Sequence, residues 1–161
     1  MYSQADVIQS IRGIPWFLDL NEKQVDSLAL ISTHTRLEPG EVLFNEGDQI
    51  GDVFIVLEGQ IAVENLVPGF GAVRITTAEA LDVLGWTTLT PMVRQRTATT
   101  RAISSCLLLV INGPSLKDLC EEDHDLGYIV MKRLANIAAG SLLATRLQLY
   151  DLIIQTQMAR S

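Results

Sequence analysis

Hydrophobic and polar residues follow a helical period in the first part of the chain. Between residues 22 and 31 the apolar side chains recur at near-helical spacing, as one face of an amphipathic helix requires. Ser3 is suited to cap an earlier helix, and Asn21 followed by Gln24 resembles a capping box at the start of this one. Residues 3–32 are therefore predicted to form helices.

From residue 33 onward the period shortens to that of β-strands. Short runs rich in β-branched and aromatic residues, such as residues 52–57, are separated by turns such as Pro39-Gly40. About eight such runs lie within residues 33–111. This pattern predicts a mainly β domain with flanking helices, built as a sandwich or a jelly roll.

Helical spacing returns after the turn that ends at Pro114. Pro114 suits the first residue of a short helix, and Asp123 or Asp125 can cap a long final one, so helices are predicted over residues 114–156. The final helix would be about 30 residues, or about 45 Å, long. Because a small barrel cannot cover that length, part of its apolar stripe is expected to meet a partner, most simply a second copy of the chain. The alternative is a helix folded back entirely onto its own barrel.

The composition fits a single globular domain over residues 1–161. The chain is 48% hydrophobic and 19% charged, which is typical of a folded protein with a sizeable core. Its formal net charge of −7 argues against nucleic-acid binding, which favours a basic face. No apolar run approaches the roughly 20 residues that span a bilayer, and the N-terminus does not resemble a signal peptide. We therefore expect a cytoplasmic protein that does not bind a membrane.

Side chains that commonly carry catalysis or bind metals are few and scattered. The chain has two histidines, His34 and His124, so it lacks the histidine cluster of a metal-binding cupin. No Ser/His/Asp or Cys/His arrangement is suggested. Cys106 and Cys120 lie in ordinary apolar segments and are interpreted as buried thiols of a cytosolic protein. We therefore expect neither an enzyme nor a metal site.

The segment from Gly85 to Ala98 carries the strongest candidate for a binding site. Arg96 and Thr97 stand next to each other near its end. A guanidinium offers a rigid fork of donors, a neighbouring hydroxyl adds another, and loop amides complete a cradle suited to phosphate. The segment therefore predicts a pocket for a small anion.

Two glycine-containing stretches give the chain a resemblance to a known family. The chain resembles the first half of a cyclic nucleotide-binding domain at residues 39–48 (PGEVLFNEGD) and 52–59 (DVFIVLEG). Over about residues 14–150 it is similar to the sensor half of a prokaryotic CRP/FNR-type regulator. This resemblance implies a double-stranded β-helix jelly roll with N-terminal helices and a long C-terminal helix.

The resemblance also bears on DNA binding. CRP/FNR-type regulators carry a helix-turn-helix after the long helix, whereas this sequence ends at Ser161 without one. We therefore expect no nucleic-acid binding by this chain alone. It is then either a stand-alone sensor or a part trimmed from a longer regulator.

The same resemblance assigns roles to individual residues. The ends of the family's phosphate-binding cassette are matched by Gly85, Arg96, Thr97 and Ala98. The match implies that Arg96 pairs with a cyclic phosphate and that Thr97 donates a hydroxyl hydrogen bond to it. Backbone amides at the start of a short helix would add a partial positive field; they belong to Gly85, Trp86, Thr87 and Thr88. An overlay of the final helix also implies that Thr145 contacts a purine.

Trp86 departs from the family pattern, which has a glutamate that accepts a hydrogen bond from the ribose 2′-hydroxyl. Tryptophan offers only a donor, and losing a charge-assisted hydrogen bond of about 1.5–3 kcal/mol would weaken a cyclic nucleotide about 10- to 100-fold. Without the carboxylate the pocket is also more positive, which favours anions in general. Thr87 and Thr88 offer neutral replacement hydroxyls.

Three residues have a structural interpretation beside the ligand-binding one. Arg96 could instead form an ion pair with a carboxylate such as Glu58 or Glu79. Trp86 could fill the former sugar site as part of the core rather than stack on a ligand. Thr145 could be a helix-surface or interface residue.

Two functions follow from these alternatives. In the first, the chain is a dimeric regulatory sensor that binds a small anion, a cyclic nucleotide or a related compound, at Arg96 and Thr97 and signals through its final helix. In the second, the pocket is degenerate and the domain is a dimeric interaction module for a protein partner that the sequence does not name.

Overall fold

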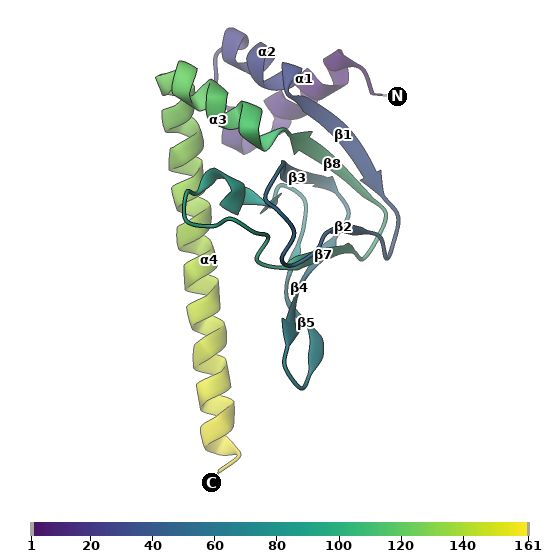
Figure 1. Ribbon diagram of the computed structural model, residues 1–161, viewed down its shortest axis with the longest axis vertical. Coiled ribbons are helices and arrows are strands. Elements are labelled where there is room, and N and C mark those ends of the chain that lie inside the picture. Colours follow the sequence, from purple (N-terminus) through teal and green to yellow (C-terminus); the bar gives the residue numbers. More distant parts are fainter. Residues whose placement is uncertain (1, 161) are drawn as a thin grey trace.

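Eight strands in two antiparallel sheets form the centre of the structure, a computed structural model that describes residues 2–160 (Figure 1). The strands are β1 (Ser32–Leu37), β2 (Val42–Phe44), β3 (Val53–Glu58), β4 (Ile61–Val67), β5 (Gly71–Ala78), β6 (Val83–Leu84), β7 (Thr99–Ala102) and β8 (Cys106–Ile111). The first sheet has the order β1-β8-β3-β6 and the second the order β2-β7-β4-β5. Most neighbours are distant in sequence, so long-range pairing defines the fold.

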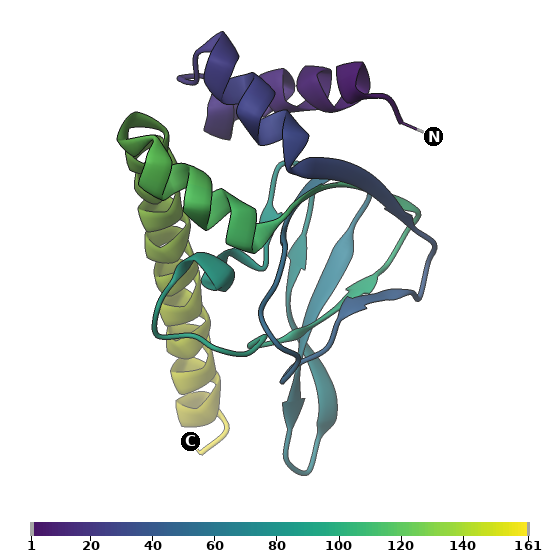
Figure 2. The same cartoon turned by 45° about the horizontal axis from the view of Figure 1, so that its top comes forward.

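Helices flank the sheets at both ends of the chain. They are α1 (Gln4–Gly13), η1 (Pro15–Phe17), α2 (Glu22–Leu30), η2 (Trp86–Leu89), α3 (Gly113–Glu122) and α4 (His124–Met158), where η marks a 3-10 helix. Figures 1 and 2 show α1 and α2 together at one end of the sheets, while α4 runs past them along one side. The predicted fold class, mainly β with flanking helices and a long C-terminal helix, is confirmed.

Strand β3 is buried on both faces and joins two hydrophobic cores. Phe54 and Val56 belong to a cluster between the sheets, whereas Val53 and Ile55 belong to a cluster beneath the helices. Because successive side chains of a strand point to opposite faces, a strand covered on both sides reads as an unbroken apolar run. This explains why residues 52–57 lack the alternation of a half-exposed strand.

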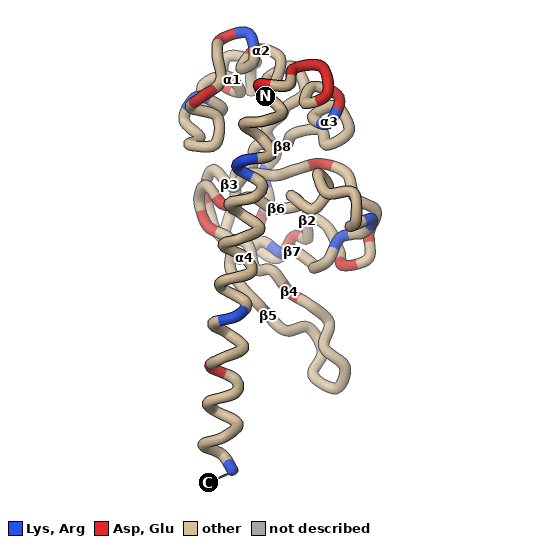
Figure 3. The backbone as a smooth tube through the Cα atoms, turned by 90° about the vertical axis from the view of Figure 1, so that its left-hand side faces the viewer, with Lys and Arg blue, Asp and Glu red and all other residues tan. Residues whose placement is uncertain are grey.

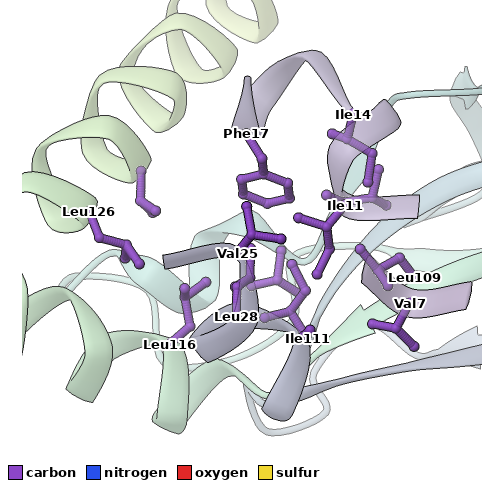
Figure 4. Packing of buried hydrophobic residues seen from close by; sticks show 14 of the residues in the cluster. Val7, Ile11, Ile14, Phe17, Val25, Leu28, Leu109, Ile111, Leu116 and Leu126 are labelled. Carbon is purple, nitrogen blue, oxygen red and sulfur yellow. The ribbon is translucent and has the colours of Figure 1, made fainter. Parts of the chain in front are cut away.

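The second core packs the N-terminal helices and the start of α4 against the outer face of the first sheet (Figure 4). Its fully buried side chains include Ile11, Leu28, Leu109, Ile111 and Leu126. Burying one side chain of this size stabilises a fold by about 1.5–3 kcal/mol. The core therefore fixes both helical ends of the chain to the same sheet.

Side-chain caps set where the helices begin. Ser3 and Asp6 form a reciprocal capping box on α1, and Asn21 and Gln24 form one on α2, which confirms both predicted helix starts. Helix α4 is capped by Asp123, one of the two candidates, whose carboxylate accepts a backbone amide hydrogen bond at 3.0 Å. The caps are local features, and local sequence was sufficient to find them.

Helix α4 extends far beyond the core. It has 35 residues and ends at Met158, slightly beyond the predicted end at residue 156. Its first turns are anchored by Leu126, Val130 and Leu134, which are buried, whereas every described residue from 141 onward is exposed. Figure 3 shows that charged positions are sparse along this exposed half.

The exposed half of α4 corrects one expectation about membranes. The sequence predicts no apolar run of bilayer-spanning length, yet α4 is long and apolar enough to cross a membrane by length and composition. Single charges such as Arg146 and Asp151 break the run without offsetting the leucine and isoleucine residues near them. One such helix is weak evidence for a membrane span.

Candidate ligand-binding pocket

A pocket of about 650 Å³ lies against the second sheet, helix η2 and the middle of α4. Strands β2, β4, β5 and β7 all contribute side chains to it, and α4 contributes residues between Ile137 and Gln148. This volume falls in the range of small-molecule sites. The pocket therefore lies where a bound molecule would touch both the sheet and the long helix.

Arg96 lies at the wall of this pocket and is only 5% exposed. Its guanidinium donates three hydrogen bonds to its own chain: Nη2 to the Asp52 carbonyl at 2.7 Å, and Nη1 to the Gly85 carbonyl at 3.3 Å and the Thr88 hydroxyl at 3.2 Å. These bonds tie η2 to the loop before β3. A guanidinium has five donor hydrogens, so two of them have no partner within residues 2–160.

The predicted alternative of an ion pair at Arg96 is not found. Within residues 2–160 neither Glu58 nor Glu79 contacts its guanidinium, and the two described ion pairs lie elsewhere. Glu79 instead accepts a hydrogen bond from the side-chain amide of Gln60 at 2.9 Å. The partners of Arg96 are neutral oxygens.

The surroundings of the guanidinium are apolar on one side. Its central carbon lies 4.4 Å from the centre of the Phe44 ring and 5.7 Å from that of Phe54. Burial lowers the pKa of Arg96, and the charges of Asp52 and Asp48 oppose that shift. The cation is thus largely removed from water, and no carboxylate within residues 2–160 contacts it.

Gly85 allows Arg96 to approach the loop. Its φ of 71° lies in the left-handed region that glycine adopts without strain. A Cβ at this position would collide with Nη1 of Arg96 and lie 2.8 Å from the carbonyl oxygen of Asp52. Glycine is required here both for the backbone conformation and for the space.

Trp86 is half-buried, lines the pocket and packs against the core beneath the N-terminal helices. It leaves the pocket open. Trp16 of η1 also lines the pocket, so both tryptophans of the chain lie at its wall. Trp86 therefore contributes to the core and presents a surface to the cavity at once.

The other predicted site residues have three different settings. Three of them line the pocket: Thr87, Thr97 and Ala98. Thr88 is buried outside the lining and supports Arg96 through its hydroxyl. Thr145 lines the pocket from α4, where its hydroxyl donates to a backbone carbonyl one turn earlier at 2.8 Å. The structure thus places every predicted site residue except Thr88 at the wall of one cavity.

Sequence reasoning missed wall residues outside the segment from Gly85 to Ala98. Thr100 of β7 is 1% exposed, and its hydroxyl has no hydrogen-bond partner within residues 2–160. Leu81 precedes β6 with a φ of 75°. Gln148 of α4 donates to the Ile75 carbonyl of β5 at 2.9 Å. No sequence signal marks the backbone of Leu81 or the partner of Gln148, since both depend on tertiary structure.

The wall combines one cation, aromatic rings and hydroxyl groups. Arg96 and Asp82 are the charged residues among those that line it. The Asp82 carboxylate accepts a hydrogen bond from the backbone amide of Glu79 at 2.8 Å. Rings come from Trp16, Phe44 and Trp86. Flat apolar surfaces next to a single cation suit an anion that carries a planar ring.

The sequence of residues 34–123 matches the family described as cyclic nucleotide-binding domain. This match covers more than half of the chain, and the chain belongs to that family. The resemblance drawn from residues 39–48 and 52–59 is thereby confirmed. No curated protein shows significant sequence similarity to the chain.

Several bacterial structures share the fold. A cyclic nucleotide-binding domain from Methylobacillus flagellatus is 20% identical with a TM-score of 0.76, covering 92% of this chain and 83% of that one. A putative cyclic nucleotide-binding protein from Geobacter metallireducens is 22% identical with a TM-score of 0.74, covering 88% and 99%. The sensor domain of the transcriptional regulator DNR from Pseudomonas aeruginosa is 14% identical with a TM-score of 0.72, covering 86% and 93%. At these identities the likeness establishes the fold alone.

Proposed function

We propose that this chain is a cytoplasmic sensor domain, not an enzyme, whose pocket binds an anion with a planar ring, a cyclic nucleotide or a related compound. The observation that carries the proposal is Arg96. It is a buried guanidinium at the wall of a large pocket, with unused donors and no carboxylate in contact within residues 2–160. Membership of the family supports a regulatory role.

Burial makes Arg96 a stronger anion site than an exposed arginine. Taking a charge out of water costs several kcal/mol unless an opposite charge accompanies it. Two unit charges 4 Å apart attract by about 4 kcal/mol at an effective dielectric constant of 20. A phosphate or carboxylate group in the pocket would supply the charged partner that residues 2–160 do not.

Trp86 limits how well a ribose can be held. Its ring nitrogen donates and cannot accept from a 2′-hydroxyl, and the neighbouring Thr87 offers only a neutral oxygen. We expect cyclic AMP and cyclic GMP to bind about 10- to 100-fold more weakly than to a domain with a glutamate here. The affinity for ring-bearing anions without a ribose is not reduced by having tryptophan in place of glutamate.

Helix α4 is the element that would report binding. It supplies one wall of the pocket and is linked to the second sheet through Gln148. A ligand shifts a conformational equilibrium only by its difference in affinity for the two states. A ligand that touches both the sheet and α4 loses contacts in any state in which α4 lies further from the sheet. It therefore binds the state with α4 close to the sheet more tightly and favours that state.

The exposed half of α4 supports a homodimer. Leu143, Leu147, Tyr150 and Ile154 follow one another at steps of four, three and four residues, and each is at least half exposed. This is the spacing of a coiled-coil seam. A second copy of the same helix would cover these side chains and pass a change at one pocket to the other protomer.

The second candidate function is a protein-interaction module that binds no small molecule. It is favoured by one observation, that three donors of Arg96 are already engaged by its own chain. Under this alternative Arg96 only braces η2. The exposed end of α4 would then serve a protein partner.

Intrinsic tryptophan fluorescence tests the choice, because both tryptophans line the pocket. The chain is titrated with cyclic AMP, cyclic GMP and naphthalene-2-sulfonate. We expect a saturable change for at least one compound. Thr97→Val should weaken it about fivefold, as the loss of one hydrogen bond of about 1 kcal/mol predicts, whereas Thr33→Val, an exposed threonine on β1, should not. No change with any compound would favour the interaction module.

A further inference from the structure

At two positions of the pocket wall the residue type does not suit the backbone conformation. Leu81 has a φ of 75°, a conformation that favours glycine, and Gly140 stands in the interior of helix α4, a position that favours alanine. Both line the same pocket. Departures from local rules tend to gather at functional sites, where they cost stability.

Leu81 is held in its conformation by backbone bonds to β3. Its amide donates to the Val56 carbonyl at 2.7 Å, and the Val56 amide donates to the Asp82 carbonyl at 3.0 Å. It is the one non-glycine residue with positive φ within residues 2–160. Its side chain is 47% exposed, so burial recovers little of the cost. A glycine would meet the same hydrogen bonds without strain.

Gly140 has no steric reason to be glycine. A Cβ built there would meet no heavy atom within 4 Å. By contrast, a Cβ at Gly127, earlier in the same helix, would lie 2.6 Å from the Cys120 carbonyl oxygen. Glycine at residue 127 serves packing, whereas glycine at residue 140 leaves an open space on the face of α4 that borders the pocket.

We propose that Leu81 and Gly140 determine which ligand the pocket accepts. Leu81 offers an apolar contact, and Gly140 lets a planar ring lie directly against the backbone of α4. The inference rests on the proposed function, which already places the anionic group at Arg96, and adds only the two residues that select the ligand's ring. The hydroxyl of Thr100 at the same pocket wall is buried and has no hydrogen-bond partner within residues 2–160, so it is free to bond a polar group of a ligand.

The experiment uses three variants of the full chain. Leu81→Asn keeps a side chain of similar size that tolerates positive φ but removes the apolar contact. Gly140→Ala adds one methyl group on α4. Gly13→Ala, at the end of α1, is the matched control, because a Cβ there also meets nothing within 4 Å and Gly13 does not line the pocket. Thermal unfolding without ligand and fluorescence titration with cyclic AMP and naphthalene-2-sulfonate are measured for each.

We expect Leu81→Asn and Gly140→Ala each to raise Tm by about 2–4 °C and to weaken binding of the better probe at least about tenfold. Gly13→Ala should leave binding unchanged. Unchanged binding in both pocket variants, with wild-type binding intact, overturns this inference and leaves the proposed function standing. Failure of the wild type to bind either of these probes, or cyclic GMP, overturns both. Gly140→Ala could instead change the oligomeric state and leave the affinity unchanged. That result would assign the face of α4 at Gly140 to contact with a partner helix and would also overturn the inference.

Discussion

Replacing Gly85 by alanine should displace the Arg96 guanidinium and destabilise the site. The added Cβ would collide with Nη1 of Arg96 and lie 2.8 Å from the Asp52 carbonyl oxygen. The guanidinium would have to move, and two of its hydrogen bonds, to the Gly85 carbonyl and the Thr88 hydroxyl, involve the displaced nitrogen.

The expected loss of stability has two parts. A left-handed backbone costs a residue with a side chain about 1–2 kcal/mol. A hydrogen bond to a charged group is worth about 1.5–3 kcal/mol, so weakening the two bonds brings the total to about 3–5 kcal/mol. Gly69→Ala separates the parts, because Gly69 has a similar φ of 81° but no atom within 4 Å of its Cβ position. That control should lose only about 1–2 kcal/mol.

Urea unfolding followed by far-ultraviolet circular dichroism measures both variants without relying on the tryptophans at the site. The free energy of unfolding should fall by at least about 2 kcal/mol more in Gly85→Ala than in Gly69→Ala. Equal losses would refute the reasoning, because they would mean that the guanidinium moves away at no cost and that its three hydrogen bonds do not hold η2.

Three further results are expected. Burial, with Glu121 and Asp123 nearby, raises the pKa of Cys120 to about 11, so its alkylation by iodoacetamide at about pH 8, followed by mass spectrometry, should be at least about 100-fold slower than that of a free cysteine. Burial also lowers the pKa of His34 below its ordinary 6.5, although the charge of Asp6 opposes the shift. The unfolded chain therefore binds more protons than the folded one at low pH, so Tm is retained above about pH 6.5 and falls as the pH drops through that value. This fall in Tm should be smaller in His34→Gln. Leu147→Asp should convert the proposed dimer to a monomer in sedimentation velocity, whereas Leu18→Asp, another exposed leucine, should not.

Local chemistry explains which parts of the fold could be predicted from the sequence. The helix starts at Ser3 and Asn21 depend on residues three positions apart, and the buried strand β3 depends on its own apolar run. Strand partners could not be predicted, because they are distant in sequence: β1 pairs with β8, the last strand of the β region. The end of α4 was uncertain because no glycine or proline marks it.

The same division holds at the pocket. The resemblance of the segment from Gly85 to Ala98 to a phosphate-binding cassette pointed to residues that line the cavity. What Arg96 contacts could not be predicted, because the Asp52 carbonyl lies 44 residues earlier in the chain. Every residue has a backbone carbonyl, so the sequence does not mark which one accepts a hydrogen bond from Arg96. A carboxylate such as that of Glu79 can be identified in the sequence, which is why the sequence suggests it as an ion-pair partner. The positive φ of Leu81 was hidden for a related reason, since backbone bonds to Val56 impose it.

Calorimetric titration of the wild type and of Arg96→Gln tests most directly whether a buried cation anchors an anion in this pocket. Glutamine keeps a donor for the loop carbonyls and removes the charge. With whichever of cyclic AMP, cyclic GMP or naphthalene-2-sulfonate binds the wild type best, we predict at least about 10- to 100-fold weaker binding in the variant, equivalent to the loss of about 1.5–3 kcal/mol. Equal affinity in the two proteins, with the variant folded by circular dichroism, would contradict the account.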